Sequence, residues 1–177
     1  MNINWQAVFN AEIAWEAIPQ ILEGLPYTLS LSLIGFALGT FCGFFVALLR
    51  MSKITPLRWL AMLHISLMRG IPLMVLLFFI YFGLPFMGIQ LDAISASIIA
   101  FTSMSSAYIS EIIRASLSAI DKGQWEAAKS LGLRTNVIYR KIIIPQAFRI
   151  ALPPLSNVLL DMVKSTSLTA MITVPEI

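Results

Sequence analysis

The sequence predicts an all-α protein that spans a membrane several times. Of its 177 residues, 58% are apolar and only 12% are charged, whereas soluble domains typically carry about 25% charged residues. The apolar residues gather in runs of roughly the 20 residues that cross a bilayer as a helix. The net charge is +3, but the basic residues cluster in two segments between these runs. This distribution is typical of cytoplasmic loops and indicates no nucleic-acid partner.

Residues 1–27 are predicted to form a distinct segment on the outer side of the membrane. No Lys or Arg precedes Arg50, so the basic region of a cleaved signal peptide is missing and we expect the segment to be retained. Apolar residues, among them Trp5 and Trp15, interleave with three glutamates. This pattern favours a short amphipathic helix that lies at the outer interface, with the tryptophans as anchors.

Residues 28–49 supply the first predicted span, because they contain no charged residue. Arg50, Lys53 and Arg58 follow, so this loop is expected in the cytoplasm and the amino terminus outside. Three glycines recur at every fourth position within the span and share one helix face where another helix can approach closely: Gly35, Gly39 and Gly43. We favour a partner helix of the same subunit, with a dimer interface as the alternative.

The second apolar region, residues 57–84, is too long for one straight span and is interrupted by Arg-Gly-Ile-Pro at residues 69–72. Proline lacks a backbone donor and clashes with the preceding turn, so a kink or break is predicted there. The chain is expected to emerge outside at residues 83–85. Residues 86–92 then form an outer loop without Lys or Arg.

Residues 93–113 are predicted to cross back to the cytoplasm, and residues 150–172 to form a fourth span outward. The intervening loop, residues 114–149, holds five central basic residues, Lys122, Lys129, Arg134, Arg140 and Lys141, and is therefore expected in the cytoplasm. Four spans place both ends of the sequence outside.

The central loop contains a spaced motif: Glu126-Ala127-Ala128, Gly132 after three further residues, Ile142 after nine more, and then Pro145. This spacing resembles the EAA loop, Glu-Ala-Ala-x3-Gly-x9-Ile-x-Leu-Pro, by which membrane subunits of bacterial ABC importers dock on their ATPase. Only the leucine differs, being Ile144 here.

From about Gly24 onward the chain is similar to the permeases of polar amino-acid ABC importers, the family of the histidine, glutamine and cystine systems. The shared segments are residues 69–73, 78–85, 107–114, 151–157 and 164–168, and Val-Pro-Glu at 174–176 also fits. Ile71, Leu76 and Ser165 depart from the usual threonine, glutamine and aspartate. Residues 65–66, 114–126 and 155–157 most resemble the cystine branch. The resemblance thus implies L-cystine as substrate, with histidine, arginine or glutamine as alternatives.

The resemblance also implies a type I ABC importer permease domain over residues 28–177, and the partners of such a subunit. They are two ABC ATPase subunits, a second permease subunit that is either another copy or a sibling, an extracytoplasmic amino-acid-binding protein, and the lipid of the bacterial cytoplasmic membrane. No glycine-rich phosphate loop occurs in the sequence, so ATP and Mg²⁺ are expected on the ATPase and no cofactor on this chain. Family members usually have one more span, so we expect a fifth helix to be missing after Ile177.

The resemblance assigns ATPase coupling to Glu126, Ala127, Ala128, Gly132, Ile142 and Pro145. Residues 124–131 are good helix formers, and Gly132 supplies the backbone freedom that ends a helix. Glu126 would pair with a basic residue of the ATPase, and small alanines would let the two surfaces approach. Pro145 is expected to stop the next helix.

Ionisable residues within spans are costly and are functional candidates by default. Arg69, Asp161 and Lys164 qualify, and with Thr166 and Ser167 they form the candidate substrate path. Asp161 and Lys164 are three residues apart and could instead neutralise each other. Arg69 could bind a carboxylate or extend to the interface. Glu111 and Arg114 are predicted to be an orienting pair at the cytoplasmic end of the third span.

Two further classes of function receive little support. An intramembrane protease would need a serine near His64, the only histidine, and an oxyanion hole, but no Gly-x-Ser-x-Gly motif is present. A passive channel would have no use for the EAA loop. The single Cys42 provides neither a disulfide nor a metal framework. We therefore expect a transport protein that is not an enzyme and holds no metal.

Overall fold

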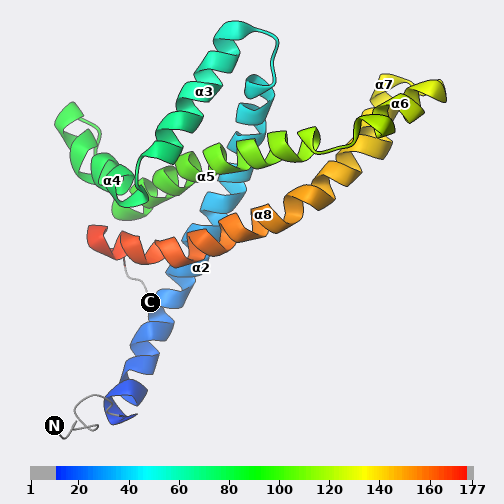
Figure 1. Cartoon of the computed structure of the whole chain (residues 1–177). Helices are drawn as coiled ribbons and strands as arrows, with labels where there is room; N and C mark the ends of the chain where they lie inside the picture. The colour runs from blue at the N-terminus through cyan, green and yellow to red at the C-terminus, as the bar shows by residue number, and fades with distance from the viewer. Residues whose placement is uncertain (1–10, 175–177) are drawn as a thin grey trace, which may run out of the picture.

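The computed structural model describes residues 11–174, all of whose regular structure is helical (Figure 1). In chain order the longer helices are α2 (Ala11–Arg50), α3 (Thr55–Gly70), α5 (Ala93–Ser118) and α8 (Ile144–Ser165). Shorter elements are α4 (Leu73–Phe78), η1 (Phe79–Gly83), η2 (Leu84–Met87), α6 (Lys122–Ser130), α7 (Thr135–Ile138), η3 (Tyr139–Ile143) and η4 (Thr166–Ile172). The all-α prediction is confirmed.

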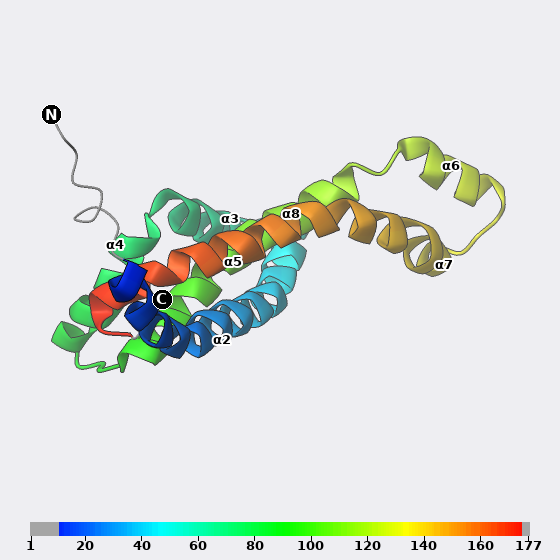
Figure 2. The ribbon, with the colours of Figure 1, turned by 90° about the horizontal axis from the view of Figure 1, so that it is seen from below.

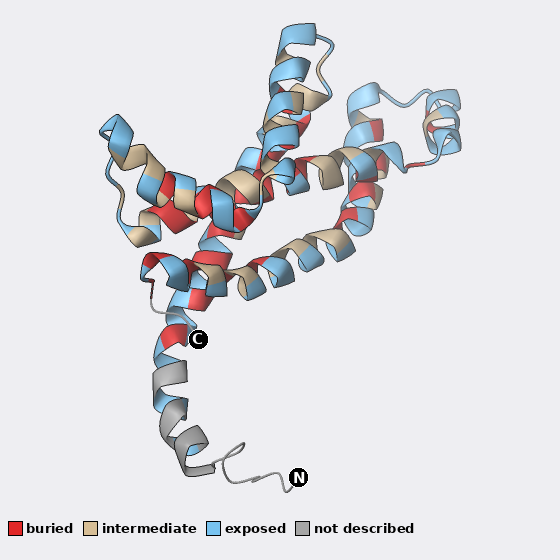
Figure 3. Cartoon of the chain, turned by 60° about the vertical axis from the view of Figure 1, so that its left-hand side comes forward, coloured by how far each residue is buried: buried red, intermediate tan, exposed pale blue. Residues whose placement is uncertain are grey.

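Three stretches of helix in the described chain are long and apolar enough to cross a membrane: Leu22–Arg50, Ala93–Ser118 and Thr135–Ile172. A fourth candidate is the pair Thr55–Gly70 and Leu73–Met87, which meets at a bend of 105°. Large apolar side chains on the outer faces, such as Phe41, Phe44 and Leu48, are exposed, as lipid-facing residues are in a membrane protein. Figure 3 shows buried residues where the helices meet and exposed residues on the outer faces.

The core forms where α2 crosses α5, with α8 packed beside both (Figures 1 and 2). A Cβ atom built on Gly35 would lie 2.8 Å from Phe101 Cβ, and one on Gly43 would lie 2.9 Å from the Ser106 carbonyl oxygen. Both neighbours belong to α5. The glycine face therefore serves close helix packing within one subunit, which was the favoured prediction.

The amino-terminal part of α2 differs from the prediction. Instead of a separate amphipathic helix before the first span, residues 11–50 form one 40-residue helix with Pro19 and Pro26 inside it. A proline removes only one hydrogen bond and can be accommodated with a kink, so neither proline ends the helix. Residues 1–10, including Trp5, lie outside the described part. Whether residues 11–27 rest at the interface stays a prediction.

The predicted break at residues 69–72 is confirmed. Helix α3 ends at Gly70, Ile71 is extended (φ −95°, ψ 128°) and Pro72 precedes α4. The residue before a proline is pushed out of the helical region by the proline ring, which explains why the chain turns there. The apolar strip then continues through α4, the π-helical turn η1 and the 3-10 turn η2.

The prediction that Pro145 stops a helix is wrong. α7, η3, α8 and η4 form one helical path over Thr135–Ile172, so the helix also begins well before the predicted fourth span and takes up part of the predicted loop. In the π-helical turn η3, the Ile144 N–H donates to the Tyr139 carbonyl, five residues back. The wider turn shifts the hydrogen-bond register just before Pro145, which then occupies the first turn of α8, where its missing donor costs little.

Candidate functional site

The first candidate site is the segment α6–η3, which projects beyond the ends of α5 and α8 (Figure 2). Asp121 starts α6, its Oδ1 accepting the Gly123 N–H at 2.6 Å. At the other end Gly132 has φ +68°. Its N–H donates to the Lys129 carbonyl, and the Leu133 N–H to the Ala128 carbonyl at 3.2 Å. These bonds form a Schellman motif, which requires the left-handed conformation that glycine adopts most easily. The predicted termination at Gly132 is confirmed.

The motif residues divide into an outer and an inner face. Glu126, Ala127 and Pro145 are exposed, and the Glu126 carboxylate has no ion pair within 4 Å among the described residues. Ala128 is only 2% exposed. Its side chain is buried within the chain. The expectation that Ala128 lets the surface of a partner approach closely is therefore not met, whereas the exposed Ala127 remains a candidate for that role.

Ala128 belongs to a small cluster, the coupling cluster, which joins α6 to the start of the long helical path. It consists of Ile120, Ala128, Ile138, Ile143 and Ala147, with Leu117, Trp125 and Ile142 packed against it. The Trp125 and Tyr139 rings pack edge to face with their centres 4.9 Å apart, and Gln146 Nε2 donates to Gln124 Oε1 at 3.2 Å. These contacts tie α6 to η3 and α8, as predicted for a mechanical connection.

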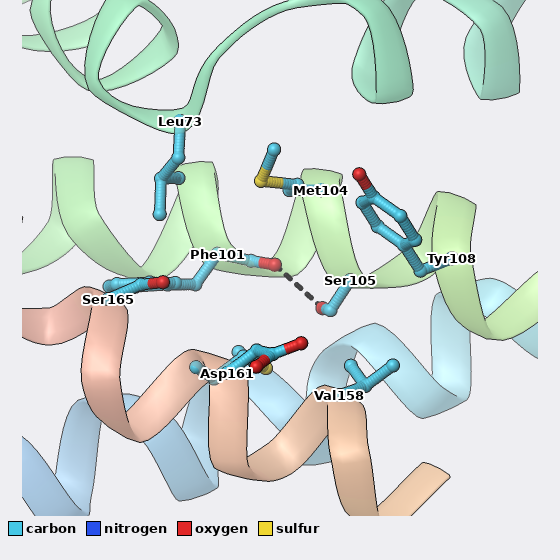
Figure 4. Close-up of a pocket in the computed structure, with 9 residues that line it drawn as sticks. Leu73, Phe101, Met104, Ser105, Tyr108, Val158, Asp161 and Ser165 are labelled. Atoms are coloured by element: carbon cyan, nitrogen blue, oxygen red, sulfur yellow. Dashed lines mark hydrogen bonds between the residues drawn. The ribbon is translucent and has the colours of Figure 1, made fainter. Parts of the chain in front are cut away.

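The second candidate site is a cavity of about 250 Å³ between α5 and α8, the α5–α8 cavity (Figure 4). It is lined by Leu73, Phe101, Met104, Ser105, Tyr108, Val158, Asp161, Met162 and Ser165. Asp161 is the one charged residue among them. Ser105 Oγ lies 2.6 Å from the Phe101 carbonyl oxygen, so its hydroxyl proton is held by its own helix. A mostly apolar cavity with one carboxylate suits a ligand that carries a cationic group.

The predicted substrate-path residues do not all reach this cavity. Asp161 does, together with Ser165 one turn later on the same helix face. Lys164 does not line the cavity and is not within 4 Å of Asp161, so the ion pair expected as the alternative is not formed. Both side chains are exposed, and an ion pair between exposed groups gains little free energy. Thr166 is buried and donates to the Val163 carbonyl, and Ser167 is exposed and donates to the Lys164 carbonyl.

Arg69 lies at a different place. It lines a second cavity, of about 450 Å³, with Glu111 and Arg114, and its Cζ atom lies 5.4 Å from the centre of the Tyr108 ring. The predicted pair is confirmed, because Arg114 Nη2 and Nε donate to Glu111 Oε2 at 2.8 and 3.0 Å. The Nε atom of Arg50, from α2, lies 3.6 Å from the same carboxylate, a third member that sequence spacing could not reveal.

Several lining residues were not predicted as site residues. Ser105 belongs to no predicted site, Tyr108 lies in a segment shared with the family, and Ser165 is a departure from the family pattern. Their helical spacing, with Phe101, Ser105 and Tyr108 on one face of α5, was the available signal, but it does not show which neighbour the face meets.

The histidine contact runs against the protease alternative. His64 Nε2 lies 2.9 Å from Ser106 Oγ, but Ser106 Oγ also donates to the Ser103 carbonyl at 2.7 Å. With its proton committed there, the hydroxyl accepts from the imidazole. A nucleophilic serine needs the reverse direction, in which the histidine takes the serine proton. The contact links α3 to α5.

Comparison with known proteins agrees with this arrangement. Residues 39–175 match the family model described as binding-protein-dependent transport system inner membrane component. The chain is 52% identical to the probable amino-acid ABC transporter permease YckA of Bacillus subtilis, over 99% of this chain and 78% of that protein. It is 40% identical to the L-cystine transport system permease TcyB of the same organism, over 93% and 73%.

A solved structure of an amino acid ABC transporter with histidines superposes with a TM-score of 0.87, at 36% identity, covering 99% of this chain and 79% of that one. This likeness confirms the predicted permease fold over the whole described chain. The family match covers more than half of the sequence and includes α6 and the α5–α8 cavity. The chain therefore belongs to the family of binding-protein-dependent transport system inner membrane components, as the non-catalytic permease subunit of an ABC transporter.

Proposed function

We propose that this permease forms half of the path of an ATP-driven amino-acid importer whose substrate is L-cystine. The observation that carries the proposal is the Asp161 carboxylate in the α5–α8 cavity, where it can pair with the ammonium group of an amino acid. The residues that resemble the cystine branch and the likeness to TcyB support cystine in particular.

The chemistry of cystine fits a paired subunit. Cystine is a symmetric disulfide with two ammonium groups, and two copies of this chain related by a two-fold axis would present one Asp161 carboxylate each. A second copy is therefore our preferred partner, with a sibling permease as the alternative. A histidine, arginine or glutamine importer is the alternative substrate assignment, which the likeness to the structure with histidines favours.

We propose that α6 is the contact to the ATPase. Glu126 and Ala127 are exposed on it, and Glu126 is free to pair with a basic residue of the partner. The coupling cluster and the Gln124–Gln146 bond join α6 to α8, and α8 carries Asp161. ATP-driven movement of two ATPase subunits, which hold the ATP and Mg²⁺, would thus be transmitted along one helix to the substrate cavity.

The remaining assignments concern the membrane. Basic residues in loops 50–58 and 114–149 support a cytoplasmic position for these loops, and hence an amino terminus outside. An amino-acid-binding protein would then deliver the substrate from the outer side, and the exposed apolar side chains would contact lipid.

The test is uptake by the full-length subunit in vesicles, assembled with its ATPase and cognate binding protein. Labelled cystine should accumulate faster than histidine, arginine or glutamine. Asp161→Asn should reduce uptake by about tenfold or more, which corresponds to the loss of one charged hydrogen bond of about 1.5–3 kcal/mol. Lys164→Gln, on the same helix but away from the cavity, should keep uptake within about twofold. Equal or faster uptake of a basic amino acid would refute the cystine assignment, and an unchanged rate in Asp161→Asn would refute the site.

A further inference from the structure

We propose that Tyr108, held by Arg69, is the inner gate of the path, separating the α5–α8 cavity from the second cavity on the side of α6. The inference rests on the proposed role of the α5–α8 cavity as the substrate site.

The two cavities follow one another along the same pair of helices. On α5 the first cavity is lined from Phe101 to Tyr108, and the second from Tyr108 to Ser116, with Ala119 just after the helix. On α8 the first cavity takes residues from Val158 onward, whereas the second takes Ile150 and Pro154. The second cavity is thus the nearer of the two to α6, the expected cytoplasmic end.

Tyr108 is the one residue that lines both cavities among the described residues. Met104, Tyr108 and Ile112 are spaced by four residues and therefore share a face of α5. A substrate that travels along this face from Asp161 toward the cytoplasm must pass the Tyr108 ring. Figure 4 shows this ring beside the labelled residues of the first cavity.

The residues on either side of Tyr108 are buried, whereas its own side chain is partly exposed. Its neighbours Ala107 and Ile109 are fully buried, at 0% exposure each, while Tyr108 itself is 38% exposed. The α5 backbone is thus anchored at this position, and a rotamer change of the partly exposed ring would not require the core to repack. An aromatic ring on a rigid support is suited to opening and closing a narrow passage.

Arg69 supplies a reason for the ring to stay closed. Its Cζ atom lies 5.4 Å from the ring centre, a cation–π contact. Arg69 occupies the last turn of α3, immediately before the 105° bend. A change in the angle between α3 and α4 would move Arg69 relative to Tyr108, so the break provides a way to release the ring.

Cysteine accessibility tests the gate without any substrate. The full-length transporter is assembled with its ATPase and held with a non-hydrolysable ATP analogue, so that the cytoplasmic side of the path is closed. It carries Cys42→Ser and one new cysteine: Ser165→Cys in the first cavity or Ala115→Cys in the second. Inside-out vesicles are treated with a cationic, membrane-impermeant methanethiosulfonate. Tyr108→Ala should accelerate modification of Ser165→Cys by about tenfold or more, while Ala115→Cys stays within about twofold. Tyr108→Phe, which keeps the ring, should leave both rates unchanged. Arg69→Met should accelerate the first site more than the second, where losing the Arg69 charge also favours a cationic reagent.

Three results would overturn the gate. The first is an unchanged rate at Ser165→Cys in Tyr108→Ala. The second is equal acceleration at both cysteines, because this reports general loosening rather than a barrier at Tyr108. The third is modification of Ala115→Cys only from the outer face, because the second cavity would then not be cytoplasmic. Since no amino acid is added, a failure of the cystine assignment leaves these rates unaffected, and the two proposals can fail separately.

Discussion

Gly43→Ala should weaken the packing between α2 and α5, the central contact of the fold. The added Cβ atom would lie 2.9 Å from the Ser106 carbonyl oxygen and 3.1 Å from Ile109 Cβ. Neither neighbour can rotate away: one is backbone, and the other is the branch point of a fully buried side chain. The two helices would have to separate by a few tenths of an ångström.

Two opposing effects set the change in the free energy of unfolding. Overpacking a close helix contact costs about 1–3 kcal/mol, whereas replacing a helical glycine by alanine gains about 0.5–1 kcal/mol. Gly70→Ala is the matched control, because it also lies in a helix but a Cβ atom there meets nothing within 4 Å. Gly70 is the last residue of α3, where the propensity gain is smaller than inside a helix, so subtracting the control removes only part of this gain. Gly43→Ala should therefore be less stable than Gly70→Ala by about 0.5–2.5 kcal/mol.

The assay is reversible unfolding of the purified protein in mixed micelles of increasing SDS fraction, followed by helicity. The midpoint for Gly43→Ala should fall below that of the unmodified chain or of Gly70→Ala, and Gly43→Val should fall further. Matching midpoints for Gly43→Ala and Gly70→Ala would refute the packing argument, and a loss of dimer at unchanged subunit stability would instead assign the glycine face to a subunit interface.

Three other predictions concern coupling and topology. Glu126→Ala should keep membrane insertion and subunit stability within about 0.5 kcal/mol but weaken co-purification with the ATPase, and Glu126→Lys should weaken it more through repulsion; normal assembly and transport of Glu126→Lys would remove the proposed ATPase contact. Gly132→Val should lower transport-linked ATP hydrolysis, because a β-branched residue resists φ +68°, while Gly132→Asn, which tolerates this region, should retain most of it; equal loss in both would show that backbone conformation is not the cause. In the Cys42→Ser background, new cysteines at Ser52 and Thr135 should react only with a reagent added on the cytoplasmic side. A new cysteine at Gly88 should react only with a reagent added outside, and the reverse pattern would contradict the topology.

Local patterns in the sequence were sufficient for the element types and for the coupling motif. Uncharged apolar runs of about 20 residues predict spanning helices, because a helix satisfies its backbone polar groups within the segment. Pro72 predicts the break, since the restriction on the preceding residue acts between neighbours in the chain. Gly132 ends α6 through its own left-handed backbone conformation, which is also a local property of the sequence. At Pro145, however, a preceding π-helical turn lets the helix continue through the proline, and the presence of a proline does not by itself predict such a turn.

The substrate side depended on contacts between distant parts of the chain. The sequence places Asp161 and Lys164 on one turn of a helix, but only the packing of α5 beside α8 decides that Asp161 lines the cavity and Lys164 does not. Likewise Arg50 joins Glu111 and Arg69 meets Tyr108 across separate helices.

Hydropathy and backbone restriction act within a few residues, so the sequence alone was enough to recognise a helical membrane permease with an EAA-like loop. For the same reason it was enough to predict the break before Pro72 and the helix end at Gly132, but not the continuous helices through residues 11–50 and through Pro145. The tertiary structure alone decided which ionisable groups face a cavity and which residue lies between the two cavities. A side chain reaches its partner through the rotation and crossing of whole helices, and these are set by the sum of many packing contacts rather than by any one segment.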